Sequence, residues 1–278
     1  MKTITTQNLL LAEDFWLFHC CILCPCPCLC LMSDIEKYRE SDQEKARTAD
    51  LLRLLPRGRR SVLDIGARDG HFSQLLTEYF DEVTALDLEK PDFSFPRVTT
   101  VAGDATNLQF ADNSFDCVFC AEVLEHIPDV AQACREIARV ARHEVLIGVP
   151  YKQDTRVGRT TCRSCGRKNP PWGHVNRFVE NQLAMLFPTL TITASSFVGS
   201  VQSATNPIST LLMDTAGNPW GTYDQDETCI YCGSKLVPPD QRPLFSKICS
   251  ALAVRIDRVQ TLFTRPHANW LHVLFSKD

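Results

Sequence analysis

The stretch Ser61–Ser73, SVLDIGARDGHFS, contains the pattern that decides the fold. A short apolar run ends in Asp64, glycines follow at Gly66 and Gly70, and helical spacing begins directly after them. A strand, a glycine turn and a helix in this order are typical of the first βα unit of a doubly wound α/β sheet. The glycines let the backbone approach a ligand, and the N–H groups at the start of the helix point to the same place. We therefore expect a ligand site at the carboxyl end of the first strand.

Apolar runs and helical periodicity repeat this unit along the chain. They predict strands at 61–65, 82–88, 98–102, 115–121 and 144–149, with helices at 71–80 and 129–142. A helix is expected between Ser33 and Leu55, before the first strand. After the fifth strand we expect a helix at 180–187 and strands at 190–197 and 270–275. Alternating strands and helices predict a doubly wound, mostly parallel α/β fold.

The last third of the chain gives weaker signals. Residues 199–240 are rich in Ser, Thr, Asn, Gly and Pro, and are predicted to form a loop. Residues 244–263 predict an amphipathic helix. Its apolar face is expected to pack on the domain, and the alternative is a helix that lies on a membrane surface; this face comprises Ile248, Leu252, Ile256 and Val259.

The composition is that of an ordinary globular protein. The chain has 278 residues, of which 44% are hydrophobic and 22% charged. This length predicts one enlarged domain, or one domain with a small module. The net charge of −4 does not indicate a basic surface that would bind nucleic acid.

Acidic residues recur where the predicted strands end. Asp87 ends the second strand, 23 residues after Asp64, which is close to the spacing of about 20 residues for an acid that binds a ribose. Asp104 follows the third strand and Glu122 follows the fourth. The alternative for Asp87 and Asp104 is that they are ordinary turn residues, with Asp104 capping the next segment.

The glycine loop DIGARDG and the sequence FDCVFCAEVLEHI at the fourth strand resemble class I S-adenosylmethionine (SAM) methyltransferases, specifically the small-molecule enzymes of the methyltransferase 11 type. The family usually has a further glycine where this chain has Arg68. The resemblance implies a seven-stranded Rossmann-like sheet, a helix before the first strand that covers the ligand, and methyl transfer to an O, N or C atom. The implied SAM-binding residues are Asp64, Gly66, Ala67, Gly70, Asp87, Leu88, Asp104, Ala105 and Glu122.

Three residues are candidates for a general base. Glu125 and His126 follow the fourth strand. His174 lies in GHVNRF, which resembles a stretch that lines the substrate side in many of these enzymes; the alternative for it is a helix-capping or zinc-adjacent histidine. Glutamate and histidine can both take a proton near neutral pH, and the sequence assigns the role to none of the three.

Cysteines indicate a metal site. Among 14 cysteines, two C-x-x-C-G units stand out, Cys162/Cys165 and Cys229/Cys232. Two thiolate pairs of this form predict one structural, four-cysteine zinc site in an insertion after the fifth strand, with free thiols or a redox pair as alternatives. Cys117 and Cys120 have the same spacing on a predicted strand, where they would point to opposite faces of the sheet.

Residues 1–31 differ from the rest of the sequence. Phe15–Met32 is apolar apart from His19, but Pro25 and Pro27 interrupt it and no signal-peptide pattern is present. We expect this cysteine-rich segment to lie outside the fold and the natural start to be Met32. A membrane anchor and a cysteine-rich metal tail are the alternatives.

Together these patterns predict four parts: an N-terminal segment (1–31), a SAM-binding core (32–150), a zinc-knuckle insertion with late core elements (151–240), and a C-terminal helix and strand (241–278). The predicted protein is a cytoplasmic methyltransferase that uses SAM, carries structural zinc and acts on a small-molecule acceptor, with no nucleic-acid or membrane partner. Neither the acceptor nor the oligomeric state follows from the sequence. The alternatives are an NAD-dependent oxidoreductase, which the missing G-x-G-x-x-G disfavours, and a non-catalytic SAM-fold binding module with a zinc interaction surface.

Overall fold

The computed structural model describes residues 38–202, 205–223 and 228–277. The segment 1–31, the expected start at Met32 and the first turn of the helix expected from Ser33 lie outside the described residues. The chain divides after Lys45 into a short N-terminal unit and a large unit of residues 46–278. In the first unit, helix α2 (Asp42–Leu54) begins where the Ser41 hydroxyl accepts a hydrogen bond from the Glu44 N–H at 3.2 Å.

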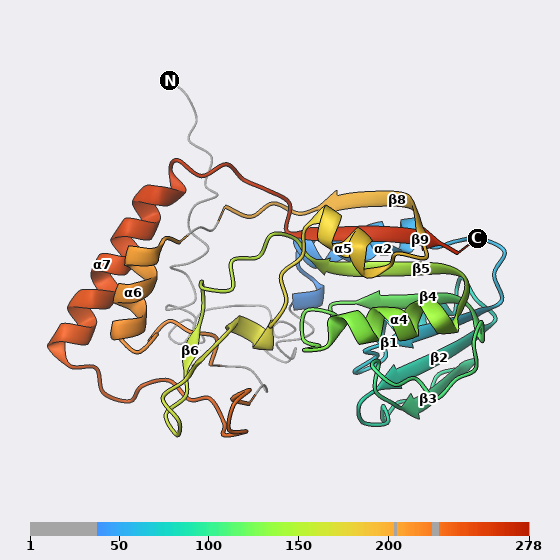
Figure 1. Ribbon diagram of the computed structural model, residues 1–278, viewed down its shortest axis with the longest axis horizontal. Coiled ribbons are helices and arrows are strands. Elements are labelled where there is room, and N and C mark those ends of the chain that lie inside the picture. The colour runs from blue at the N-terminus through green and yellow to red at the C-terminus, as the bar shows by residue number, and fades with distance from the viewer. Residues whose placement is uncertain (1–37, 203–204, 224–227, 278) are drawn as a thin grey trace, which may run out of the picture. The chain divides into compact units, whose positions relative to one another are not determined.

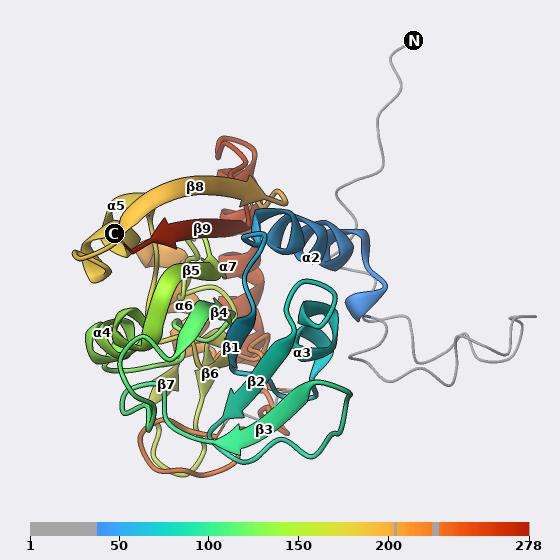
Figure 2. The same ribbon diagram turned by 90° about the vertical axis from the view of Figure 1, so that its right-hand side faces the viewer.

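A seven-stranded sheet organises the large unit, in the order β3-β2-β1-β4-β5-β9-β8. Its members are β1 (Ser61–Ile65), β2 (Glu82–Asp87), β3 (Val98–Ala102), β4 (Phe115–Ala121), β5 (Ala141–Pro150), β8 (Thr191–Val198) and β9 (Trp270–Ser276). The first five strands are parallel, and β9 runs antiparallel between β5 and β8. Figure 2 shows the twist of this sheet along its strand order. The predicted doubly wound, mostly parallel sheet is confirmed.

Helices cover both faces of the sheet, as Figure 2 shows. On one face, α2 and α3 (His71–Leu76) pack over a buried cluster that includes Leu51, Leu76 and Cys117. On the other, α4 (Val130–Val140) and α5 (Glu180–Leu186) pack over a cluster that includes Cys120 and Ile137. The expected placement of Cys117 and Cys120 on opposite faces is confirmed, and neither is part of the cysteine site.

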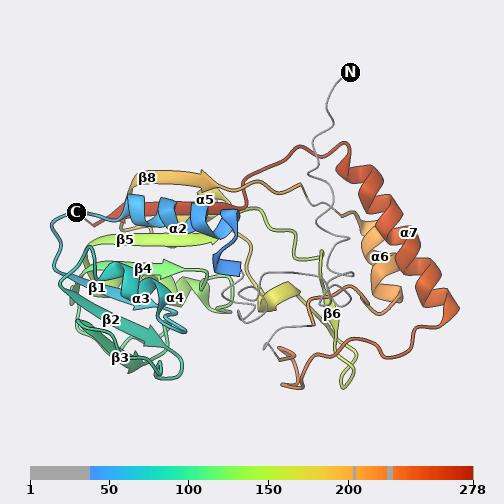
Figure 3. The same cartoon turned by 180° about the vertical axis from the view of Figure 1, so that it is seen from behind.

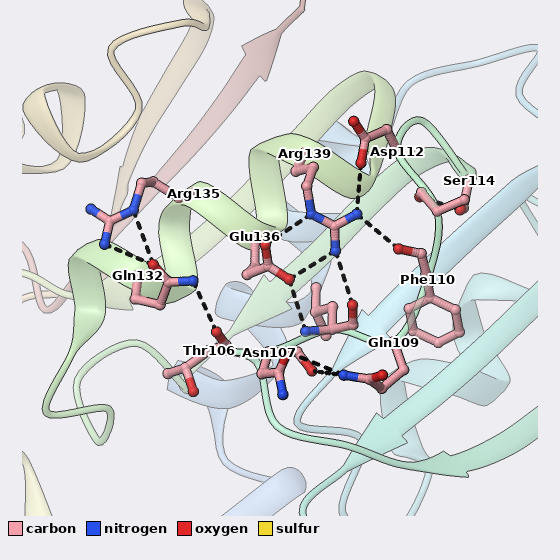
Figure 4. Close-up of polar contacts among 12 residues, drawn as sticks. Thr106, Asn107, Gln109, Phe110, Asp112, Ser114, Gln132, Arg135, Glu136 and Arg139 are labelled. Atoms are coloured by element: carbon pink, nitrogen blue, oxygen red, sulfur yellow. Dashed lines mark hydrogen bonds and ion pairs between the residues drawn. The ribbon is translucent and has the colours of Figure 1, made fainter.

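A polar network ties α4 to the loop between β3 and β4 (Figure 4). The Arg139 guanidinium donates to the carbonyl oxygens of Leu108 and Phe110 and to the carboxylates of Asp112 and Glu136. Glu136 in turn accepts from the Leu108 N–H at 2.9 Å. Because the loop supplies its backbone groups to a helix that is anchored in the core, the segment that follows β3 is held in one place.

The region after β5 contains more structure than expected. A short hairpin, β6 (Thr160–Thr161) with β7 (Lys168–Asn169), and a 3₁₀ turn, η2 (Pro171–Gly173), precede α5. Helix α6 (Pro207–Thr215) lies inside the stretch 199–240, so the prediction of loop there is wrong for these nine residues. The Asn206 side chain accepts from the N–H groups of Ile208 and Ser209, and Pro207 occupies the first helical position. Both features are helix-start signals that were available in the sequence.

Helix α7 (Leu244–Thr261) forms as predicted, but it packs through a different face. Its buried residues are small: Ser246, Cys249, Ser250 and Ala253. They lie against α6, where Ser209 Oγ donates to the Ala253 carbonyl at 3.0 Å. Figures 1 and 3 show α6 and α7 side by side.

The apolar face expected to pack is largely exposed: Ile248, Leu252 and Val259 keep 49%, 45% and 58% of their surface. The face with the small residues packs against α6 because small side chains let the two helix backbones approach closely. Within the described ranges, no helix combines the length and the apolar character needed to cross a membrane.

The two faces of α7 differ in a measurable way. Ala253→Leu should lower the free energy of unfolding by about 1–3 kcal/mol, because the added atoms have no room against α6. Val259→Ala should change it by no more than ~0.5 kcal/mol, because the side chain is already exposed. Urea unfolding of both variants tests this, and the reverse ranking would show that the face predicted from sequence is the packing face.

Candidate active site

The glycine turn after β1 has the backbone that its sequence demands. Gly66 and Gly70 adopt φ angles of 81° and 82°, which side-chain-bearing residues rarely adopt. A Cβ on Gly66 would lie 2.2 Å from Val123 Cγ2, and one on Gly70 would lie 2.7 Å from Phe93 Cζ. Arg68, where the family pattern has glycine, also takes a positive φ of 44°. The turn therefore keeps its shape despite this departure.

Asp64 is the next-to-last residue of β1 and lies inside the protein. The residue is 2% exposed, and one carboxylate oxygen accepts from the Ser73 hydroxyl at 2.6 Å. Burial raises the pKa of Asp64 to about 7, while the Ser73 hydrogen bond opposes the shift. Asp64 thus joins β1 to α3 beneath the glycine turn.

Asp87 lies at the end of the neighbouring strand β2 and faces the same turn. One of its oxygens accepts from the Arg68 N–H at 2.9 Å and the other from the Leu88 N–H at 2.7 Å. The Leu88 side chain is exposed. The structure therefore places Asp87 beside the glycine loop. An acid that contacts a ligand bound at this loop has to lie there.

Asp104 and Ala105 follow β3. Asp104 Oδ1 accepts from both the N–H and the hydroxyl of Thr106 at 2.8 Å. This bonding is the turn-capping role that was the alternative for Asp104. Ala105 is buried, and so is Ala67 in the glycine turn. The Thr106 carbonyl accepts from Gln132 of α4 at 3.1 Å, so the turn is anchored to that helix (Figure 4).

Glu122 directly follows β4 with a φ of 57°, and its N–H donates to the Gly148 carbonyl at 2.9 Å. The guanidinium of Arg47 in α2 lies 4.0 Å from the Glu122 carboxylate. Arg47 is buried, 5.4 Å from the ring centroid of Phe72 and 5.8 Å from that of Trp270. Sequence analysis missed Arg47. The signal was its position on α2, four residues before Leu51 and so on the same buried face.

The three base candidates come together. A carboxylate oxygen of Glu125 and one ring nitrogen each of His126 and His174 lie within 4.8 Å of one another. The two histidine rings meet edge to face, with centroids 4.6 Å apart. Burial holds the pKa of Glu125 well above its usual range, and the nearby Glu122 carboxylate adds to the shift. Burial, with a contribution from His126, lowers the pKa of His174 to about 3.

Backbone hydrogen bonds hold the His174 segment against the end of β4. The N–H groups of Val175 and Asn176 donate to the Glu125 carbonyl at 2.8 and 3.0 Å. The Asn176 side chain donates to the carbonyls of Leu124 and Ile127 at 2.9 and 2.7 Å. His174 Nδ1 is 2.6 Å from Gln153 Oε1. Sequence analysis singled out neither Gln153 nor Asn176, because only the folded chain brings Gln153 to His174 and Asn176 to Leu124 and Ile127.

The two C-x-x-C-G units also meet. The Sγ atoms of Cys162 and Cys232 are 3.6 Å apart, as are those of Cys165 and Cys229, and all four lie within 4.8 Å of one another. The two turns are alike: the Gly166 N–H donates to the Cys162 carbonyl at 2.9 Å and the Gly233 N–H to the Cys229 carbonyl at 2.8 Å. Four sulfur atoms bound to one zinc at about 2.3 Å would lie no more than about 5 Å apart, so the set has the spacing of such a site.

Comparison with known proteins finds a likeness in the core. A family model described as "Methyltransferase domain" matches residues 63–147, from β1 to β5. The biotin biosynthesis bifunctional protein BioHC of Cellvibrio japonicus is 36% identical over 145 residues, which cover 49% of this chain and 28% of that protein. A demethylmenaquinone methyltransferase of Roseiflexus is 38% identical over 93 residues, which cover 29% of this chain and 38% of that enzyme. The chain therefore spans well under half the length of these curated relatives.

A solved structure extends the likeness of fold beyond the core. The N-methyltransferase NodS from Bradyrhizobium japonicum, in complex with S-adenosyl-L-homocysteine, superposes with a TM-score of 0.50 at 16% identity. The match covers 89% of this chain and 93% of NodS. The seven-stranded fold is thus shared with this solved structure, and the family model for a methyltransferase domain matches its part from β1 to β5.

The buried Asp64 should make stability depend on pH. Its pKa is raised in the folded protein, so the folded state holds the proton between about pH 4 and pH 7 while the unfolded state has lost it. The group therefore destabilises the fold progressively as pH rises through this window, by up to roughly 4 kcal/mol. Asp64→Asn keeps an acceptor for Ser73 and should lose less stability than the parent protein between pH 5 and pH 8 in urea unfolding. Parallel losses in both proteins would show that Asp64 does not titrate in this range.

Proposed function

We propose that this chain is a SAM-dependent methyltransferase that transfers a methyl group to a small-molecule acceptor. The observation that carries the proposal is the convergence of strand-end groups within the matched methyltransferase domain. Asp64, Gly66 and Asp87 come from adjacent strand ends, and the loop carrying Asp104 follows the next one. Ligands bind at this edge in open α/β sheets.

The cofactor would lie against the glycine turn. The turn brings its backbone to the ligand without intervening side chains, Asp87 would accept from ribose hydroxyls, and Asp104 and Ala105 would lie beside the adenine. Glu122, which Arg47 approaches, would face the amino-acid end. SAM supplies an electrophilic methyl group on a sulfonium. Transfer is an in-line displacement, so the chain contributes largely by fixing the geometry of the two reactants.

The acceptor would approach from the side of Glu125, His126 and His174. The low pKa of His174 keeps its imidazole neutral, so one ring nitrogen keeps its lone pair on the side of the acceptor. The names of the relatives, which refer to biotin biosynthesis and demethylmenaquinone, support a small-molecule acceptor.

The insertion after β5 would carry one structural zinc ion. Support comes from the spacing of the sulfur atoms of Cys162, Cys165, Cys229 and Cys232 and from the two matched turns. Four thiolates close a tetrahedral zinc shell and leave no position for water, so the ion would have no catalytic role. It would join the β6–β7 hairpin to the chain before α7.

Replacing Asp87 tests the cofactor site. Asp87→Ala should weaken SAM binding by ~1–3 kcal/mol, because ribose hydroxyls would lose their acceptor and the Arg68 N–H would lose its partner in the turn. Calorimetric titration with SAM measures the change. Glu89→Ala, which removes an exposed carboxylate two residues further on, is the matched control and should bind SAM normally. Equal affinity in the two variants would rule out the ribose contact.

Elemental analysis tests the zinc site. Purified protein should contain about one zinc per chain, and Cys229→Ser should lower this content, because a three-thiolate shell binds the ion less tightly. Cys249→Ser is the control, since Cys249 is a buried cysteine outside the cluster and its loss should leave the zinc content unchanged. Protein that contains no zinc when purified without chelators would contradict the site.

A further inference from the structure

Glu125, His126 and His174 bring together the donor atoms of a metal site. One carboxylate oxygen and two imidazole nitrogens, from chain positions almost 50 residues apart, lie within 4.8 Å of one another. Ligand atoms bound to a divalent transition metal at about 2.0–2.2 Å are separated by at most about 4.4 Å. The ligand atoms therefore need to move together by only a few tenths of an ångström, through small side-chain rotations, to bind one ion.

The Glu125 carboxylate is the strongest indication of a bound cation. The residue is fully buried, and neither of its oxygen atoms has a hydrogen-bond partner among residues 38–202, 205–223 and 228–277. A buried carboxyl group without a partner is costly, and in proteins such groups are paired or coordinate metals. The side chain reaches the two histidines, and a cation held between the three would satisfy it.

His174 is oriented as metal-binding histidines are. Its Nδ1 lies 2.6 Å from the amide oxygen of Gln153, which can only accept, so Nδ1 carries the proton and donates. Nε2 then has its lone pair available for an ion. A hydrogen bond from the other ring nitrogen to a carbonyl oxygen is the usual way in which proteins fix the tautomer of a ligating histidine.

The backbone makes this arrangement rigid. The Val175 and Asn176 N–H groups donate to the Glu125 carbonyl, and Asn176 also holds the carbonyls on either side of Glu125 and His126. The two segments that carry the ligands are therefore fixed to each other independently of any ion. Such preorganisation is what a binding site requires.

We propose that Glu125, His126 and His174 bind one divalent transition-metal ion of the Mn²⁺, Fe²⁺ or Zn²⁺ class beside the acceptor site. Two imidazoles and one carboxylate suit these ions, whereas the four thiolates of the insertion select zinc. Three protein ligands leave open coordination positions. If the methyltransferase function proposed above holds, the acceptor is an oxygen nucleophile whose hydroxyl group occupies one of them.

This placement defines the chemistry of the acceptor. Coordination lowers the pKa of a hydroxyl group, as it does that of water, and the hydroxyl proton passes to a water molecule. An oxygen lone pair then forms the new bond to the methyl carbon as the carbon–sulfur bond breaks. That electron pair stays on sulfur and gives S-adenosylhomocysteine. The metal is neither oxidised nor reduced.

Mn²⁺ binding, followed by electron paramagnetic resonance, tests the proposal on the full chain. Thiolates select zinc and carboxylate oxygen suits Mn²⁺, so protein that elemental analysis shows to hold one zinc per chain reports on the second site alone. We expect one Mn²⁺ per chain in the parent protein. Affinity should fall at least ~10-fold in Glu125→Gln and also in Gln153→Ala, which removes the partner of a ligand without removing a ligand. Glu78→Gln, an exposed glutamate in the turn after α3, should bind Mn²⁺ as the parent does.

The outcomes are separable. Parent protein that leaves the free Mn²⁺ signal unchanged, or equal Mn²⁺ affinity in the parent and Glu125→Gln, overturns the metal site. If Glu125→Gln does not fold, His126→Asn takes its place under the same criterion. SAM titration of the same samples reports on the methyltransferase function independently. Binding of SAM without Mn²⁺ would refute only the metal site, and binding of Mn²⁺ without SAM would refute the function and, with it, the assigned acceptor.

Discussion

The parallel pairing of β1 with β2 and β4, and of β2 with β3, is the constraint on which the candidate site depends. Parallel strands end at the same edge of a sheet, so residues that are 20 or more positions apart in the sequence become neighbours in space. The register Ile65↔Leu86 places the glycine turn beside Asp87, and the hydrogen bond from the Arg68 N–H follows from it. Apolar clusters cover both faces of the sheet, and the buried Asp64 lies near the edge at which open α/β sheets bind ligands.

The core of the fold was predictable because its signals are local. Short apolar runs bounded by turn residues mark strands that are buried on both faces, and each predicted strand from β1 to β4 matches the structure to within a residue. The packing of α7 was not predictable in the same way. Its periodicity identifies a helix. Whether the Val259 face or the Ala253 face packs depends on the side chains of α6, which lies some 40 residues away in the sequence.

The same distinction applies to the site. Asp87, Glu122 and Glu125 stand directly after strands, so their position at the sheet edge follows from the strand assignments. Arg47 and Gln153 reach the site from other elements and lie in no motif, and Asn176 lies in the GHVNRF stretch without being singled out there. Arg47 could have been found from its place on the buried face of α2. Gln153 and Asn176 could not, because their role depends on the path of the chain through the insertion after β5.

That path links the two metal-binding candidates. Only the segment 166–173 separates the first cysteine pair from His174, and the Asn169 side chain in this segment accepts from the Ile230 N–H of the second cysteine turn at 3.0 Å. Any ion that holds the four cysteines together would also fix this segment, and with it the position of His174 relative to Glu125. The glycine turn is anchored separately, through the Asp64–Ser73 hydrogen bond, and Asp87 is anchored by the pairing of β2 with β3. Zinc in the insertion would therefore affect the acceptor side of the site, because it would hold residues 166–176 in place. The SAM side would be held by the sheet.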